Sequence, residues 1–394
     1  MPLALYLLAL AVFAMGTSEF MLAGLVPEIA AGLDVSVGSA GLLTSAFAAG
    51  MILGAPVMAA FARPWPARSM LLGCLMIFTM CHVIAALTPS FAVLFATRLV
   101  AAMANAGFLA VALRTATRLV APDRKGRALA ILLSGTTIAI VAGVPAGSLL
   151  GTALGWRATF WAVAVLCLPA AVGIATGIRP AGRTSLGEPD HEPSLRAELA
   201  QLRTPHVLIA MLLGALVNGG TFAAFTYLAP VVTATAGLDP VWVPVALMLF
   251  GTGSFAGIVV AGRLSDAHPR LVLGIASPVL FAGWLILALC AARPVLLLSL
   301  IIVQGVLAFA VGGTLIARVL YAASAAPTMG GSYATAALNL GAAAGPAIGA
   351  LALAGHDELA PVWVAAVLTG TATLMVLPSL RLIAPRAHRV APTG

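Results

Sequence analysis

Long apolar runs follow one another along this 394-residue chain, separated only by short stretches with Pro, Gly or charged residues. A helix needs about 20 apolar residues to cross the hydrocarbon core of a membrane, and only helices or closed barrels satisfy their backbone groups there. Barrel strands alternate apolar and polar residues, whereas these runs are continuous. With 8% charged residues against roughly a quarter in soluble domains, the chain is predicted to be an all-α integral membrane protein.

Hydropathy predicts twelve membrane-spanning helices in two sets of six. A stretch rich in Pro, Gly and charged residues separates the sets and predicts a cytoplasmic linker at 181–205, between an N-terminal bundle (1–180) and a C-terminal bundle (206–394). The predicted helices are 4–28, 38–60, 70–87, 92–113, 128–150, 158–178, 207–229, 241–262, 271–291, 295–317, 332–354 and 361–382.

The two sets repeat each other. "AGLDVS" at Ala31 matches "AGLDPV" at Ala236, and "GVPAG" at Gly143 parallels "GPAIG" at Gly345. The spacings of 205 and 202 residues are nearly equal, which indicates two pseudo-symmetric six-helix bundles. Transporters built from repeats bind substrate near the membrane midplane, between the repeats, and alternate access by rocking one half against the other.

The basic residues predict the topology. All of the 20 Lys and Arg residues except Arg98, Arg157 and Arg293 fall in one set of alternating loops or at the C-terminus, and such loops face the cytoplasm. We therefore expect a multi-pass protein of the inner (plasma) membrane with both termini in the cytoplasm. The net charge of +8 follows from this bias, and scattered basic residues without a reading module do not indicate nucleic acid as a partner.

Several motifs resemble those of the major facilitator superfamily. "GRLSDAHPR" (Gly262 to Arg270) resembles the loop motif G-x-L-x-D-x-x-x-R between helices 8 and 9, whereas Arg63 replaces the acid in the loop between helices 2 and 3. "RLVAAMANAG", starting at Arg98, resembles the helix-4 motif of proton-driven members. "GVPAGSLLGTALGWRATFW", starting at Gly143, resembles the helix-5 motif of exporters.

Other strings resemble, more narrowly, the chloramphenicol resistance (efflux) proteins of actinomycetes, in the twelve-helix drug:proton antiporter group. They are "GTSEFMLAGLVPEIA", "NAGFLAVAL", "GWRATFWAVAVL" and "GSYATAALNLGAAAGP". The resemblance implies a monomeric transporter, not an enzyme, that exports chloramphenicol or a related small amphipathic drug. The proton gradient would drive export by alternating access, without a cofactor, and would confer antibiotic resistance.

Two other functions stay open. The same machinery could export a sugar or another metabolite. A membrane-embedded sensor or enzyme belongs to a different class, and catalysis would need clustered ionisable groups. Away from the ends of the predicted helices, the membrane interior offers only Glu19, His82 and Arg98, on three separate helices, and the four cysteines lack metal-site spacing. No P-loop string is present, which argues against direct ATP drive.

Glu19 is the residue least expected in such a chain. At 1.5 Å per residue it lies about 24 Å along a helix from Leu3 and about 18 Å from Ala31, so it cannot easily reach water from either end. Burying its charge costs roughly 3 kcal/mol, which suits a carboxyl that gains and loses a proton near neutral pH. We predict that Glu19 and Arg98 couple transport to protons through a contact made in only part of the cycle; the alternative is a permanent structural pair.

Polar and aromatic residues of the predicted cavity helices are candidates for binding substrate. An Asn or Gln in a bundle is as often an interhelical hydrogen bond, worth about 0.6 kcal/mol, and aromatic side chains usually pack. His82 is interpreted as a packing residue. The candidate substrate-binding residues are Glu19, Asn105, Asn218, Thr221, Phe222, Phe225, Gln304 and Tyr333.

Charges in the predicted cytoplasmic loops suggest a gate. Asp123, Arg127, Asp266 and Arg270 could form ion pairs that hold the inner face shut, or could simply be solvated. We predict no metal site.

Overall fold

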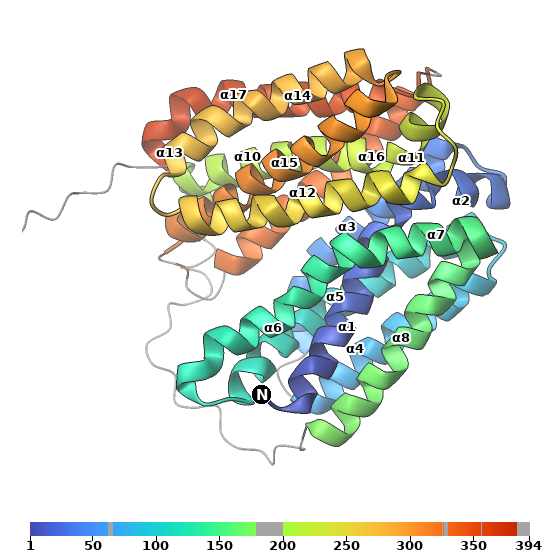
Figure 1. Cartoon of the computed structure of the whole chain (residues 1–394). Helices are drawn as coiled ribbons and strands as arrows, with labels where there is room; N and C mark the ends of the chain where they lie inside the picture. The colour runs from blue at the N-terminus through green and yellow to red at the C-terminus, as the bar shows by residue number, and fades with distance from the viewer. Residues whose placement is uncertain (62–65, 179–199, 325, 327–329, 356, 384–394) are drawn as a thin grey trace, which may run out of the picture.

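The computed structural model describes residues 1–61, 66–178, 200–324, 326, 330–355 and 357–383 (Figure 1). Every spanning element in these ranges is a helix, and twelve helices are long and apolar enough to cross a membrane, which confirms the all-α prediction. The first six are built from α1 (Leu3–Phe20), α2 (Val26–Leu33), α3 (Val37–Phe61), α4 (Ala67–Leu87), α5 (Phe91–Arg118), α6 (Lys125–Ile138), α7 (Val144–Leu154) and α8 (Trp156–Gly177). The second six are built from α10 (Pro205–Thr226), α11 (Leu228–Pro230), α12 (Trp242–Leu264), α13 (Pro269–Leu271), α14 (Ser277–Cys290), α15 (Pro294–Ala322), α16 (Gly330–Leu353) and α17 (Ala360–Ile383).

The two sets form two bundles, each with a core of its own (Figure 1). The cores interlock at a few positions, because Tyr227 packs into the first core while Ala23 and Val144 pack into the second. Most of the predicted linker, residues 181–199, lies outside the described residues, so its boundaries stay a prediction.

The first spanning helix is broken, whereas the sequence predicted one helix over 4–28. α1 ends at Phe20, a 3₁₀ turn covers Met21–Gly24, and α2 starts at Val26. Pro27 causes the break, because it has no N–H to donate and its ring excludes the carbonyl four residues earlier. The α-helix therefore ends one residue after Glu19.

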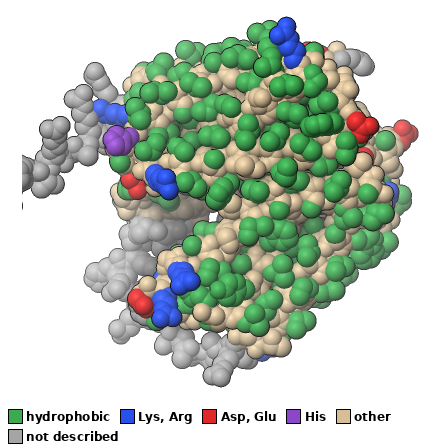
Figure 2. All heavy atoms as spheres, in the orientation of Figure 1, with side chains coloured by type: hydrophobic (Ala, Val, Ile, Leu, Met, Phe, Trp, Pro, Cys, Tyr) green, Lys and Arg blue, Asp and Glu red, His purple; other side chains and the backbone are tan. Residues whose placement is uncertain are grey.

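The bundles touch at one end and separate at the other. At the closed end, which carries segments 34–36, 236–241 and 357–359, Gly38 lies so close to α16 that a Cβ would be 3.1 Å from the Ala350 carbonyl oxygen. Nearer the middle, Gly251 of α12 packs on the backbone of Ile140. At the open end, which carries segments 119–124 and 265–268, Figure 2 shows a hollow between the bundles, edged by Lys, Arg and acidic side chains. This hollow, called the vestibule below, lies between the bundles at the end opposite the Gly38 contact.

Tyr227 holds the closed end together. Its ring is fully buried, and its hydroxyl lies 2.9 Å from the Pro346 carbonyl oxygen of its own bundle and 3.3 Å from the Gly38 carbonyl oxygen of the other. Gly41 makes this approach possible, since a Cβ there would collide with the Tyr227 hydroxyl and ring. The contact joins the two bundles through a position where only glycine fits.

Glu28, at the closed end, makes the stability of the folded protein depend slightly on pH. It lies on α2, beyond the end of the first spanning segment at Gly24, and one of its carboxylate oxygens accepts a hydrogen bond of 3.3 Å from Thr152. Burial raises the pKa of Glu28, while the Thr152 hydrogen bond lowers it by less. The folded protein therefore binds this proton more readily than the unfolded chain, so stability is lost as the pH rises through the raised pKa.

We expect the melting temperature of the native protein, relative to Glu28→Gln, to fall between pH 5 and pH 8. Because the side chain is partly exposed, the relative change should be small, of the order of 1–2 °C. Thermal unfolding of both proteins in detergent across this range checks it. A relative melting temperature that rises with pH would contradict the burial of this carboxyl.

Candidate functional site

Arg98 is buried in the first bundle and bonded to α1. It is 1% exposed, and its two terminal nitrogens donate to the hydroxyl and to the backbone carbonyl of Ser18, at 2.7 and 2.8 Å. The guanidinium carbon lies 4.4 Å from the centre of the Phe47 ring. Its Nε has no hydrogen-bond partner among the described residues, so this cation keeps one donor unused.

Glu19 follows Ser18 directly and is partly exposed. Among the described residues, the structure shows neither a hydrogen bond nor an ion pair of Glu19, although Arg98 is near enough to act on it electrostatically. The two predicted proton-coupling residues are therefore brought together without being paired.

His82 completes the group around Ser18. Its Nε2 lies 2.7 Å from the Ser18 hydroxyl and its Nδ1 2.7 Å from the Phe78 carbonyl oxygen. The rings of Phe78 and Phe160 pack at 4.2 and 5.8 Å from the imidazole. Ser18 is not distinctive in the sequence, since hydroxyls are common in apolar helices; its position next to Glu19 was the available signal.

An aromatic cluster joins the bundles beside Glu19. Phe20 of α1 packs against Phe222 and Phe225 of α10, with ring centres 5.8 and 6.5 Å apart. Phe225 continues to Phe250 of α12 at 4.7 Å. The structure thus brings the predicted pair Phe222 and Phe225 together and adds Phe20, whose partner across the interface could not be inferred from its own helix.

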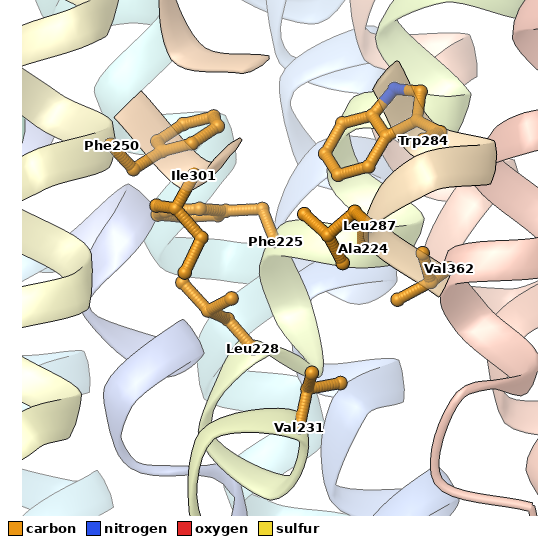
Figure 3. Close-up of a pocket in the computed structure, with 9 residues that line it drawn as sticks. All are labelled: Ala224, Phe225, Leu228, Val231, Phe250, Trp284, Leu287, Ile301 and Val362. Atoms are coloured by element: carbon orange, nitrogen blue, oxygen red, sulfur yellow. The ribbon is translucent and has the colours of Figure 1, made fainter. Parts of the chain in front are cut away.

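A small apolar pocket lies behind this cluster, inside the C-terminal bundle (Figure 3). Phe225 and Phe250 form one side of it, and Trp284, Ile301 and Val362 belong to the rest of the wall. Phe225 therefore contacts both the interface between the bundles and an apolar space in the second bundle.

The other candidate substrate residues bond within their bundles. Asn218 is partly exposed and donates to the Leu338 carbonyl at 2.7 Å, whereas Thr221 is buried and donates to Val217 of its own helix. Asn105 is buried, with its amide 3.6 Å from the Met51 sulfur.

Gln304 and Tyr333 lie deeper in the second bundle. Gln304 is fully buried and donates to the Leu280 carbonyl at 3.1 Å, between α14 and α15, and Tyr333 is buried in the core of that bundle. In this conformation, the structure does not bring either of them to Glu19 and Arg98.

The fold and the sequence place the chain in a known family. Residues 8–335 match the family described as Major Facilitator Superfamily. The chain belongs to the Major Facilitator Superfamily. It is accordingly a multi-pass membrane transporter rather than an enzyme.

Relatives of this transporter cover nearly its whole length. It is 63% identical over 389 residues to a chloramphenicol resistance protein of Streptomyces lividans, spanning 98% of each chain. It is 34% identical over 382 residues to the inner membrane transport protein YdhP of Escherichia coli, spanning 95% of each.

Solved structures share its fold. A bacterial homolog to human lysosomal transporter Spinster, in an inward-facing and occupied conformation, superposes with a TM-score of 0.76 at 17% identity, covering 95% of this chain and 96% of that one. The nucleoside transporter NupG (D323A mutant) gives 0.75 at 14% identity, covering 95% and 98%.

The predicted gate residues of this major facilitator protein lie at the open end. Asp266 pairs with Arg318 of its own bundle at 3.7 Å and accepts a hydrogen bond of 3.1 Å from Tyr321. Arg318 also donates to the Ser265 carbonyl. Arg318 lies near the end of α15, next to the loop that carries Asp266, and this proximity could not be recognised from the sequence.

The remaining gate candidates lie on both bundles. In the first bundle, Asp123 pairs with its neighbour Arg124 at 3.7 Å, and Arg127 is exposed. Arg270, in the second bundle, is partly buried. The Asp123–Arg124 pair lies within the first bundle and the Asp266–Arg318 pair within the second, so neither of them joins the halves at the open end.

Proposed function

We propose that this transporter exports chloramphenicol, or a closely related small amphipathic drug, in exchange for protons and so confers resistance to it. The observation that carries the proposal is the 63% identity to the Streptomyces chloramphenicol resistance protein along 98% of both chains. From this similarity along the whole chain we expect the two proteins to share a substrate.

The open end is proposed to face the cytoplasm. Basic residues gather in the loops at this end, including Arg124, Lys125 and Arg263, and the positive-inside rule assigns such loops, with both termini, to the cytoplasmic side. The structure then represents the inward-facing conformation, in which a drug enters the vestibule from the cytoplasm or the inner leaflet. The transporter works as a monomer, without a cofactor.

Glu19 is proposed to carry the exchanged proton. It is a carboxyl inside the first spanning segment, beside the interface of the bundles, with Arg98 close enough to stabilise its ionised form. A proton moving through about 150 mV releases roughly 3.5 kcal/mol. For an uncharged drug exchanged one for one, this supports a concentration ratio of a few hundredfold.

The aromatic cluster is proposed to bind the ring of the drug. Phe20, Phe222 and Phe225 come from both bundles, so a ring held among them contacts each half. Aromatic contacts contribute about 0.5–1.5 kcal/mol beyond burial. Asn218, partly exposed on the same helix as Phe222, is the nearest candidate for the polar end of the drug.

Uptake of labelled compounds into inverted vesicles tests the substrate. With the vesicle interior acidified, we expect chloramphenicol to accumulate many-fold and to do so only while the pH gradient persists. A labelled pentose and a labelled hexose, tested in parallel, should stay at the external concentration. Accumulation of a sugar without accumulation of chloramphenicol would overturn the proposal in favour of metabolite export.

A further inference from the structure

Hydrogen-bond directions around Ser18 are fixed by chemistry. A carbonyl oxygen can only accept, so the Nδ1 that lies 2.7 Å from Phe78 O carries the hydrogen. The neutral ring then accepts at Nε2, where the Ser18 hydroxyl lies 2.7 Å away and donates. The same hydroxyl oxygen accepts from Arg98 at 2.7 Å. The chain therefore runs from Arg98 to Ser18 to His82 to the Phe78 carbonyl, and Ser18 and His82 each accept from one neighbour and donate to the next.

No water can replace a member of this chain. Ser18 is 0% exposed, and His82 and Arg98 are each 1% exposed, beneath the rings of Phe47 and Phe78. A positively charged His82 would turn Nε2 into a donor toward Ser18, leave the Ser18 hydrogen without its acceptor and place two cations on one oxygen. The arrangement therefore requires a neutral His82.

Ser18 and Glu19 are neighbours that compete for one cation. Both terminal nitrogens of Arg98 are used by Ser18, while its Nε is buried without a partner and Glu19 has no partner at all among the described residues. Arg98 can exchange one neighbour for the other by a change of side-chain conformation. The groups that bear on Glu19 from the elements packed around α1 are Arg98 of α5 and, next to it, Cys81 and His82 of α4. α3 and α7 carry no ionisable side chain. In α6, Lys125 and Arg127 lie in the first turn at the open end. In α8, Arg157 donates to the Thr88 carbonyl and Cys167 lies beside Thr79.

We infer that Ser18 and His82 are positioning residues of proton coupling: they hold Arg98 away from Glu19 in the open conformation, so that Glu19 keeps its proton until substrate arrives. Release of Arg98 from Ser18 to Glu19 then stabilises the carboxylate, and the proton leaves to the water of the vestibule. This inference rests on the proposed function. In it, Arg98 is restrained by Ser18 and His82, neither of which is proposed to contact the drug.

Substitution of Ser18 tests the restraint at fixed pH. In purified Ser18→Ala, Arg98 loses its bond to the hydroxyl and keeps only the bond to the backbone carbonyl of residue 18, so it pairs with Glu19 more readily before drug is added. We expect the ratio of protonated to ionised Glu19, read from its carboxyl infrared band as the difference from Glu19→Gln, to fall about tenfold at pH 7. Protons released per drug bound should fall toward zero, while drug binding persists.

Rescue and control variants separate positioning from folding. Ser18→Thr keeps the hydroxyl, and His82→Gln keeps an acceptor for it, so both should resemble the native protein, whereas His82→Leu should resemble Ser18→Ala. Ser254→Ala is the matched control, since Ser254 is also buried but bonds only to Phe250 of its own helix. If Ser18→Ala fails to fold, the comparison of His82→Leu with His82→Gln tests the same restraint on Arg98.

The outcomes are distinguishable. A native band and native proton release in both Ser18→Ala and His82→Leu would overturn the inference. The inference would also be overturned if Ser254→Ala changed the carboxyl infrared band of Glu19 in the same way. Absence of proton release from the native protein would instead contradict the proposed function, whatever the variants show.

Discussion

Glu19→Gln is expected to abolish concentrative export while leaving the protein folded. Glutamine has the shape of the protonated carboxyl but cannot release a proton, so drug movement is no longer tied to the gradient. The steady-state ratio of drug across the membrane should fall from a few hundredfold, the value one proton supports at about 150 mV, to about one. Accumulation of labelled drug in inverted vesicles, with and without a pH gradient, measures this ratio.

Glu28→Gln is the matched control for this loss. Glu28 lies on α2, nine residues after Glu19 and beyond the end of the first spanning segment, and the same change of charge there should leave the ratio nearly native. If Glu19→Gln still accumulates drug to the native ratio, the carboxyl does not carry the coupled proton.

Gly41→Val is expected to prevent closure of the end held by Tyr227. A side chain at Gly41 overlaps the Tyr227 hydroxyl and ring, so the bundles cannot meet there without displacement. Overpacking of this kind costs about 1–3 kcal/mol, which corresponds to about a tenfold to hundredfold shift of population away from the conformation that is closed at this end. Export should fall in proportion, because under the proposed function the drug is loaded in that conformation.

Spin labels at Ala31 and Val241, exposed positions at the closed end on opposite bundles, report the shift as a longer distance. Gly73→Val is the matched control, since a Cβ at Gly73 meets nothing within 4 Å. Adding Tyr227→Ala to Gly41→Val should restore the short distance by removing the overlap. An unchanged distance distribution in Gly41→Val would contradict the role of this contact.

The twelve helices were predictable because each apolar run is long enough to span a membrane and is followed by Pro, Gly or charged residues that end it. The break after Phe20 was not, because the hydropathy of Met21–Gly24 continues without interruption and the effect of Pro27 falls several residues before it. The π-helical stretches Ala139–Gly143, Val231–Thr235 and Val272–Ala276 left no signal either, since they change the hydrogen-bond register and not the composition.

A site residue was predictable from the sequence where burying it in the membrane costs much free energy. It was not predictable where its role depends on which residues lie next to it in space. Glu19 and Arg98 stand out because ionisable groups are rare inside membrane-spanning segments. Ser18 and Phe20 became apparent only from their partners, Arg98 and Phe222, which lie far away in the sequence. For Gln304 and Asn105, sequence alone does not tell a helix face toward the vestibule from one toward a neighbouring helix, and both bond within their own bundle here.

Drug-induced proton release is the most direct test of the coupling. Purified transporter in weakly buffered detergent solution, titrated with chloramphenicol at pH 7, should release up to one proton for each drug bound, and Glu19→Gln should bind drug while releasing almost none. Equal proton release from both proteins would show that the exchanged proton comes from another group and would contradict the account.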